Sequence, residues 1–173
     1  MAYTFFKAEG GKIGKSLCED GEIDNVLKML EDAKKRGVKL LLPFDSVAAS
    51  EYSNDVEAVT YQSNDVPDGM MALDIGPRAI KEFTDEISKA GTIVWNGPMG
   101  VFEFSKFAEG TRAVACAVAD SGAISIIGGG DSAAAVRKFG LEDKITHIST
   151  GGGASLEFME GKVLPGIACL LDN

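Results

Sequence analysis

Two runs of three glycines have the composition of anion-binding loops. Gly128–Gly130 lies between the short apolar run Ser125–Ile127 and an alanine-rich segment, and Gly151–Gly153 stands at the same place in the next unit. A strand, a glycine turn and a helix start bring backbone N–H groups and a helix N-terminus to one point, which suits phosphate oxygens. Alternatively, glycines at these positions only permit tight turns and close packing of the helix against the strand. Two successive units of the same kind favour a bound anion.

Asp131 and Ser132 directly follow the first glycine run. Both residue types can cap the helix that the alanine-rich segment predicts, and capping is the commonest role of an aspartate at such a position. Alternatively, the Asp131 carboxylate can hold a magnesium ion against a bound polyphosphate, directly or through water. The residues alone leave both roles open.

A third glycine-rich loop, Asn96–Glu103, begins at the end of an apolar run. Glu103 is either an ordinary surface carboxylate or an acceptor for hydrogen bonds from a ribose diol. Trp95 lies inside the predicted strand, so we expect it in the core. We expect a structural role for the sole histidine, His147, because no nucleophile or carboxylate is placed to work with it.

The hydrophobic pattern predicts apolar strands that alternate with helices, which is the pattern of an α/β fold with a mainly parallel sheet. Ligands of such sheets bind outside the carboxyl ends of the strands, where all three glycine-rich stretches would collect. Within residues 54–75 the side-chain types alternate with the two-residue period of strands. This pattern predicts a small antiparallel excursion that ends in a strand at Met71–Ile75. The predicted strands of the parallel sheet are Val38–Leu42, Thr92–Asn96, Ala123–Ile127 and Ile145–Ser149, and the predicted helices span Glu22–Arg36, Pro77 to about Ala90, Glu109–Asp120 and the residues up to about Lys138.

The bulk composition is that of a globular protein without an internal domain boundary. The chain has 173 residues, 45% of them hydrophobic, and a net charge of −9. This charge argues against a nucleic-acid partner, and the apolar runs are too short to span a membrane. Three widely spaced cysteines and the absence of a signal-peptide pattern predict reduced thiols in the cytoplasm. Because the chain is negatively charged, a polyanionic ligand would need nearby positive charge from helix N-termini, a divalent cation or lysines.

Two further glycine patterns are poorer matches to known nucleotide motifs. Gly10–Ser16 resembles a P-loop, but Glu9 stands where the first glycine is required, so we interpret it as a polar loop. Gly128-x-Gly130-x-x-Ala133 matches the loose dinucleotide fingerprint. An NAD site would need an acidic residue after the next strand, which ends at Ser149, so an NAD-binding domain ranks below phosphate binding.

Three motifs, in this order and spacing, resemble the signature stretches of the phosphoglycerate kinase family. They are Trp95-Asn96-Gly97-Pro98-Met99-Gly100-Val101-Phe102-Glu103, Gly128-Gly129-Gly130-Asp131-Ser132 and Ser149-Thr150-Gly151-Gly152-Gly153-Ala154-Ser155-Leu156-Glu157. Leu73-Asp74-Ile75-Gly76-Pro77 and Leu164-Pro165-Gly166 support the resemblance, which extends over essentially the whole chain.

The resemblance implies phosphoryl transfer between 1,3-bisphosphoglycerate and MgADP, which yields 3-phosphoglycerate and MgATP in glycolysis. It also implies a three-layer Rossmann-like sheet with helices on both faces. Leu73 would lie against the adenine, Asn96, Pro98 and Val101 would line the nucleotide pocket, and Glu103 would bind the ribose. Gly129, Gly130, Asp131 and Ser132 would surround the phosphates, with Asp131 at the Mg²⁺ ion, and Gly130, Gly152 and Gly153 would face the transferred group.

Members of the family are about twice as long as this chain, so the resemblance implies that residues 1–173 are part of a C-terminal, nucleotide-binding domain. The acid-binding N-terminal domain, a Gly-Gly-Ala-Lys stretch and two central strands would lie outside this sequence. We therefore expect the chain alone to be nearly inactive. We also expect that the sheet closes the gap left by the two strands, that its open edges pair with a second copy or a complementary fragment, or that the chain is part of a longer protein. A noncatalytic nucleotide-binding or interaction module is the alternative function.

Overall fold

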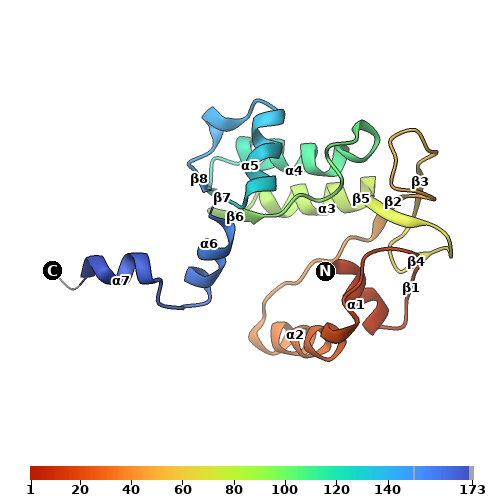
Figure 1. Ribbon diagram of the computed structural model, residues 1–173, viewed down its shortest axis with the longest axis horizontal. Coiled ribbons are helices and arrows are strands. Elements are labelled where there is room, and N and C mark those ends of the chain that lie inside the picture. The colour runs from red at the N-terminus through yellow and green to blue at the C-terminus, as the bar shows by residue number, and fades with distance from the viewer. Residues whose placement is uncertain (150, 172–173) are drawn as a thin grey trace. The chain divides into compact units, whose positions relative to one another are not determined.

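A computed structural model describes residues 1–149 and 151–171 and divides them into two compact units (Figure 1). The first unit comprises Met1–Glu86 and Met99–Val114, and the second comprises Ile87–Pro98 and the residues from Ala115 onward. The chain passes between the units inside two helices and in one loop, so no linker of distinctive composition marks the boundary. This explains why the sequence shows none.

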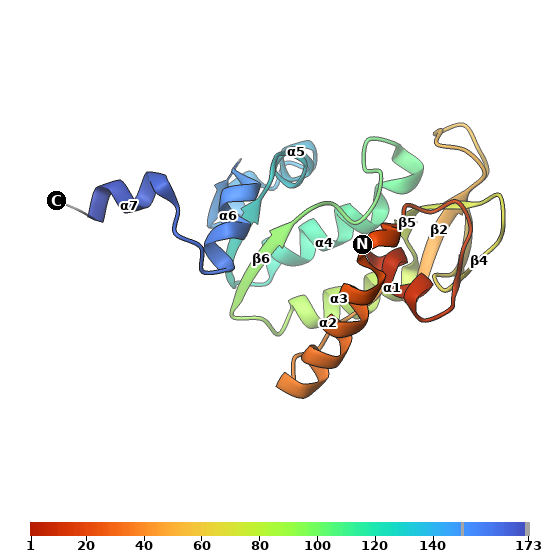
Figure 2. The same cartoon turned by 60° about the horizontal axis from the view of Figure 1, so that its bottom comes forward.

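The first unit is built on a three-stranded antiparallel sheet in the order β3-β2-β5, which confirms the predicted antiparallel excursion. Figure 2 shows β2 next to β5. Ala49, Leu73 and Phe107 pack together as one buried cluster of this unit. A short parallel pair, β1 with β4, lies outside the sheet. The strands are β1 (Lys12–Ile13), β2 (Asp45–Ala49), β3 (Val59–Gln62), β4 (Asp65–Val66) and β5 (Met71–Ile75).

Two helix ends in the first unit lie at the residue types that the sequence suggested, whereas α1 was not predicted and α3 ends at Ile87, before the predicted end near Ala90. α2 ends at Gly37, whose φ of +66° is the left-handed conformation that glycine adopts at a helix C-terminus. α3 begins at Pro77, which is suited to a first helical position. The helices are α1 (Ala2–Ala8), α2 (Ile23–Arg36) and α3 (Pro77–Ile87), with 3₁₀ turns η1 (Asp20–Glu22) and η2 (Ser105–Phe107) and the first half of α4 (Glu109–Asp120).

The N-terminus of α3 is capped by a residue from a different element. Gly76, which precedes the helix, has no side chain, and the carboxylate of Asp45 on β2 occupies the space that a side chain would fill. Asp45 accepts hydrogen bonds from the backbone N–H groups of Arg78 at 3.1 Å and Ala79 at 2.8 Å. These contacts satisfy two of the amides that every helix leaves open at its start.

The prediction of a strand at Val38–Leu42 is wrong. The segment has no regular secondary structure and no ladder partner among the described residues, and Val38 and Leu40 are 59% and 41% exposed. The strand begins instead at Asp45, where β3 and β5 supply hydrogen-bonding partners on both sides. An apolar run becomes a strand only when another strand lies beside it, and local sequence does not reveal that partner.

The second unit contains a three-stranded parallel sheet in the order β6-β7-β8, with α5 on one side and α6 on the other (Figure 1). Trp95 and Ile127 on one face of the sheet are buried, whereas Val94 on the other face is 43% exposed. This confirms the predicted α/β class and Trp95 as a core residue. The elements are β6 (Thr92–Asn96), β7 (Ile124–Gly128), β8 (His147–Ser149), α5 (Gly130–Lys138), α6 (Gly152–Met159), α7 (Pro165–Leu171), η3 (Glu142–Lys144) and the second half of α4.

None of the helices in residues 1–149 and 151–171 has the length and apolar character needed to cross a membrane.

Candidate functional site

The carboxyl ends of the three parallel strands lie next to one another, as the α/β pattern predicts. Asn96 at the end of β6 is in register with Gly128 on β7, and Gly128 is in register with Ser149 on β8. The loops that follow these residues therefore start side by side. Thr150 of the third loop lies outside the described residues.

The two triple-glycine turns pack directly against each other. A Cβ atom on Gly152 would lie 2.7 Å from the Cα atom and 2.9 Å from the backbone nitrogen of Gly129, which leaves no room for a side chain. The same position would lie 3.2 Å from Oδ1 of Asn96. Gly129 itself has a φ of +90°, which strongly favours glycine. The starts of α5 and α6 thus meet beside the Asn96 amide.

The structure corrects the predicted caps of α5. The N-cap is Gly129, which makes no side-chain hydrogen bond, so neither Asp131 nor Ser132 caps the helix. Ser132 is fully buried, and its hydroxyl oxygen accepts a hydrogen bond of 2.6 Å from the backbone N–H of Gly97. Ser132 therefore ties the β6 loop to the first turn of α5. Asp131 is exposed on that turn.

This edge of the second unit has the chemistry of an anion site. Gly130 and Gly153 are exposed, and a Cβ on either would meet open space. The first backbone N–H groups of a helix have no partner within the helix and carry partial positive charge. Two adjacent helix starts can therefore donate several hydrogen bonds to phosphate oxygens. Pro98 and the exposed amide of Asn96 belong to the same loop edge.

The remaining predicted residues belong to the first unit, where they lie close together. The backbone N–H of Val101 donates a hydrogen bond of 2.8 Å to the carbonyl oxygen of Leu73. Val101 also packs against the buried cluster that includes Leu73. Glu103, two residues further along the loop, is exposed. Leu73 is thus part of the buried cluster, Val101 borders it, and Glu103 lies outside it on the loop.

Asp74, the second residue of the Leu73-Asp74-Ile75-Gly76-Pro77 motif, is a buried carboxylate next to the proposed nucleoside residues. It is 4% exposed and accepts hydrogen bonds from the backbone N–H groups of Ile75 at 2.9 Å and Gly110 at 2.8 Å. Burial, with a smaller contribution from the charge of Glu109, raises the pKa of the Asp74 carboxyl group to about 6, against the opposing effect of these hydrogen bonds. An aspartate inside an apolar strand was the signal that could have identified it.

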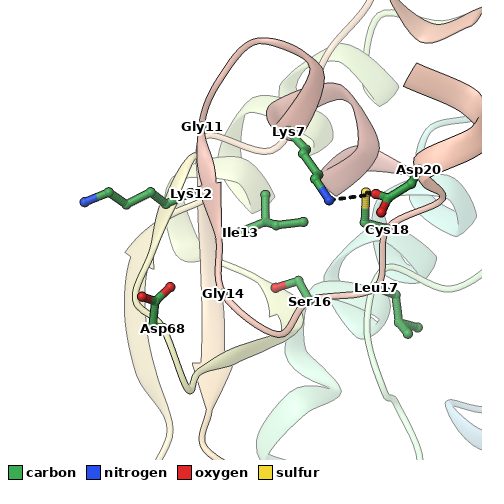
Figure 3. A pocket seen from close by; sticks show the side chains of 10 residues that line it. All are labelled: Lys7, Gly11, Lys12, Ile13, Gly14, Ser16, Leu17, Cys18, Asp20 and Asp68. Atoms are coloured by element: carbon green, nitrogen blue, oxygen red, sulfur yellow. Dashed lines mark hydrogen bonds and ion pairs between the residues drawn. The ribbon is translucent and has the colours of Figure 1, made fainter. Parts of the chain in front are cut away.

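The loop that resembled a P-loop lines a cavity of about 500 Å³ in the first unit (Figure 3). It follows helix α1 and contains only the two-residue strand β1, so it lacks the strand–loop–helix arrangement of a P-loop. Lys7 is paired with Asp20 at 2.7 Å, and Figure 3 shows the Lys12 side chain directed away from the cavity. The interpretation as a polar loop is therefore confirmed.

A second hollow, of about 400 Å³, lies in the second unit between the exposed face of the sheet and helices α6 and α7. Its walls are almost entirely apolar and include Val94, Ile126, Phe158 and Ile167. Across the described ranges there is no group of three or more histidine, cysteine, aspartate or glutamate side chains placed to hold a metal ion. The single histidine, His147, is exposed at the start of β8.

Comparisons with known proteins agree on one family. The sequence model of phosphoglycerate kinase matches residues 1–162. A phosphoglycerate kinase of Clostridium tetani is 59% identical over 173 residues, which are 100% of this chain and 43% of the relative. The solved phosphoglycerate kinase of Coxiella burnetii has a TM-score of 0.94 at 47% identity, over 99% of this chain and 44% of that chain.

The solved enzyme of Pyrococcus horikoshii is more distant, with a TM-score of 0.75 and 35% identity over 98% of this chain and 43% of that chain. This chain therefore spans less than half the length of the relatives that it matches. The match to the family model, together with the glycine-rich edge that carries its motifs, shows that the chain belongs to the phosphoglycerate kinase family.

Proposed function

We propose that this chain supplies the nucleotide half-site for reversible phosphoryl transfer between 1,3-bisphosphoglycerate with ADP and 3-phosphoglycerate with ATP. The observation that carries the proposal is the direct packing of Gly152 on Gly129 beside Asn96, which brings two helix starts together at one sheet edge. Phosphoryl transfer depends mainly on positioning and on stabilisation of negative charge, and clustered backbone N–H groups provide both.

In this proposal different predicted residues contact different parts of the nucleotide. Leu73 lies against the adenine, Glu103 accepts hydrogen bonds from the ribose, and Asn96, Pro98 and Val101 line the pocket. Gly129, Gly130, Asp131 and Ser132 surround the phosphates, and Gly130, Gly152 and Gly153 face the transferred group. Ser132 would contribute through its backbone, since its hydroxyl oxygen already accepts a hydrogen bond from Gly97.

Asp131 is the proposed protein ligand of a magnesium ion. Its carboxylate is exposed in the first turn of α5, next to the proposed phosphate position. Mg²⁺ in nucleotide sites is commonly held by one or two carboxylates together with phosphate oxygens and water, so a single aspartate is a sufficient donor set here. A bound Mg²⁺ would neutralise charge that develops on the phosphate oxygens.

The chain alone is proposed to be nearly inactive and to act in the cytoplasm as part of a longer phosphoglycerate kinase. The acid substrate would be held by the part of the family's length that has no counterpart in this sequence. Support for pairing with a complementary fragment or a second copy comes from Val38–Leu42, which has no strand partner among the described residues, and from the partly exposed apolar face around Val94, which borders the hollow beside α6 and α7. Such edges and faces are normally covered.

A titration of MgADP into the isotopically labelled chain tests the nucleotide half-site, with Mg²⁺ alone as the control. We expect shifts of backbone amide signals at Gly128–Ser132 and around Glu103. The variant Asp131→Ala should bind MgADP at least about tenfold more weakly, because a charge-assisted metal contact is lost. A dispersed spectrum that MgADP does not change would contradict the proposal.

A measurement of kinase turnover distinguishes the proposed kinase half-site from a noncatalytic nucleotide-binding module. A coupled kinase assay of the isolated chain should show almost no activity, and addition of the missing N-terminal part should restore it. Nucleotide binding without any restored turnover would favour the noncatalytic module. Turnover by the isolated chain at the rate of a full-length relative would contradict the proposed half-site.

A further inference from the structure

We propose that Asp74 and Thr111 are positioning residues that hold the backbone of Met99–Val101 in the conformation that receives the nucleoside part of the nucleotide. This inference rests on the proposed function, and it extends the site by two residues that make no predicted contact with the ligand. Its consequence is selective: losing either side chain should weaken recognition of the base and ribose but leave recognition of the phosphates unchanged.

Thr111 anchors the start of the segment. The residue lies in the first turn of α4 and is fully buried. Its hydroxyl oxygen accepts hydrogen bonds from the backbone N–H of Met99 at 3.1 Å and of Gly100 at 3.2 Å. One side-chain atom thus sets the direction of two consecutive peptide groups in the loop.

Asp74 fills the space beneath the same segment. A Cβ atom on Gly100 would overlap the Asp74 carboxyl group and the carbonyl oxygen of Leu73, so the loop backbone lies directly against both. A Cβ on Gly110 would likewise overlap the Asp74 carboxyl group, which accepts the N–H of Gly110 at 2.8 Å. Asp74 therefore joins the loop to the start of α4, the helix that carries Thr111.

The anchored backbone leads directly into the proposed nucleoside contacts. Val101 follows Gly100 and donates its N–H to the carbonyl oxygen of Leu73 at 2.8 Å, and Glu103 lies two residues further on. A rotation of the peptide groups at Met99 and Gly100 would therefore displace both the apolar surface and the carboxylate. All of these contacts lie within the first unit, whereas the proposed phosphate contacts of Gly129–Ser132 lie within the second.

The test compares Thr111→Val, which keeps the shape but removes the accepting oxygen, with Thr111→Ser, which keeps the oxygen. Two probes are titrated: MgADP, and magnesium tripolyphosphate, which lacks base and ribose. We expect Thr111→Val to bind MgADP about tenfold more weakly, the effect of roughly one lost hydrogen bond. Tripolyphosphate affinity should not change, and Thr111→Ser should bind MgADP like the unmodified chain. Hydrogen exchange of the Met99 and Gly100 amides should accelerate in Thr111→Val only.

Equal weakening of both probes, or unchanged MgADP affinity in a folded Thr111→Val, would overturn the inference and leave the proposed function standing. Failure of the unmodified chain to bind MgADP would overturn the proposed function, and this inference with it. If Thr111→Val does not fold, Asp74→Asn provides the second variant, because it keeps one oxygen and the volume of the side chain. It must show the same selective loss of MgADP binding.

Discussion

Replacing Asp74 with asparagine should remove a pH dependence from the stability of the first unit. Burial raises the pKa of this carboxyl group from 3.8 to about 6 in the folded chain. The folded state therefore binds more protons than the unfolded state between these values, and stability increases as the pH falls. The full contribution, present below the unfolded pKa and lost as the pH rises through 6, is about 3 kcal/mol.

About 2 kcal/mol of this contribution should appear between pH 7 and pH 4.5, because the unfolded carboxyl group is still largely ionised at pH 4.5. Asparagine does not titrate, so the unfolding free energy of the unmodified chain minus that of Asp74→Asn should increase by this amount on acidification. Urea unfolding at the two pH values measures it. Asp68→Asn, which removes an exposed carboxylate, controls for the change in net charge.

A difference that stays constant with pH, or that decreases on acidification, would refute the reasoning. The first result would mean that the Asp74 carboxyl group titrates alike in the folded and unfolded chain. The second would mean that the hydrogen bonds from Ile75 and Gly110 outweigh burial and stabilise the ionised form. Either result would remove the electrostatic account of Asp74 but not its contacts with the loop.

Two further predictions concern stability. Asp45→Ala should lower the unfolding free energy by about 1 to 2 kcal/mol, because two amides in the first turn of α3 lose their acceptor. An unchanged urea midpoint would contradict this prediction. Asp68→Ala is the control. Gly152→Ala should cost about 1 to 3 kcal/mol in thermal or urea unfolding, because the new methyl group overlaps the backbone of Gly129. Gly153→Ala is the matched control, since its Cβ meets open space, and equal losses in the two variants would contradict the prediction.

Short-range sequence signals were sufficient for the elements whose ends are set locally. Pro77 predicted the start of α3, Gly37 the end of α2, and the apolar run Thr92–Asn96 predicted β6 with its observed bounds. Helix hydrogen bonds join residues four apart, and caps lie within a few residues of the ends, so the information is contained in the segment itself. The glycine-rich turns after β7 and β8 could be recognised for the same reason.

Contacts between distant segments could not be predicted in this way. The apolar run Val38–Leu42 had the composition of a strand but has no partner among the described residues, while the unpredicted β2 has one on each side. Asp45 caps a helix that begins 32 residues later, and Asp74 accepts the amide of Gly110. Neither pairing has a local signal, because the donor and the acceptor are brought together only by the sheet.

In the candidate site, too, some features follow from local sequence and others depend on contacts between distant segments. Residue types and spacing alone predicted the glycine loops, Asp131 and Glu103 as the chemistry-bearing positions and suggested the family. The packing of Gly152 on Gly129, the use of the Ser132 hydroxyl as an acceptor for Gly97, and the Thr111 anchor became visible only in the folded chain. Local propensity biases the backbone conformation of a segment, but strand pairing, burial and hydrogen-bond partners depend on residues that are distant in sequence.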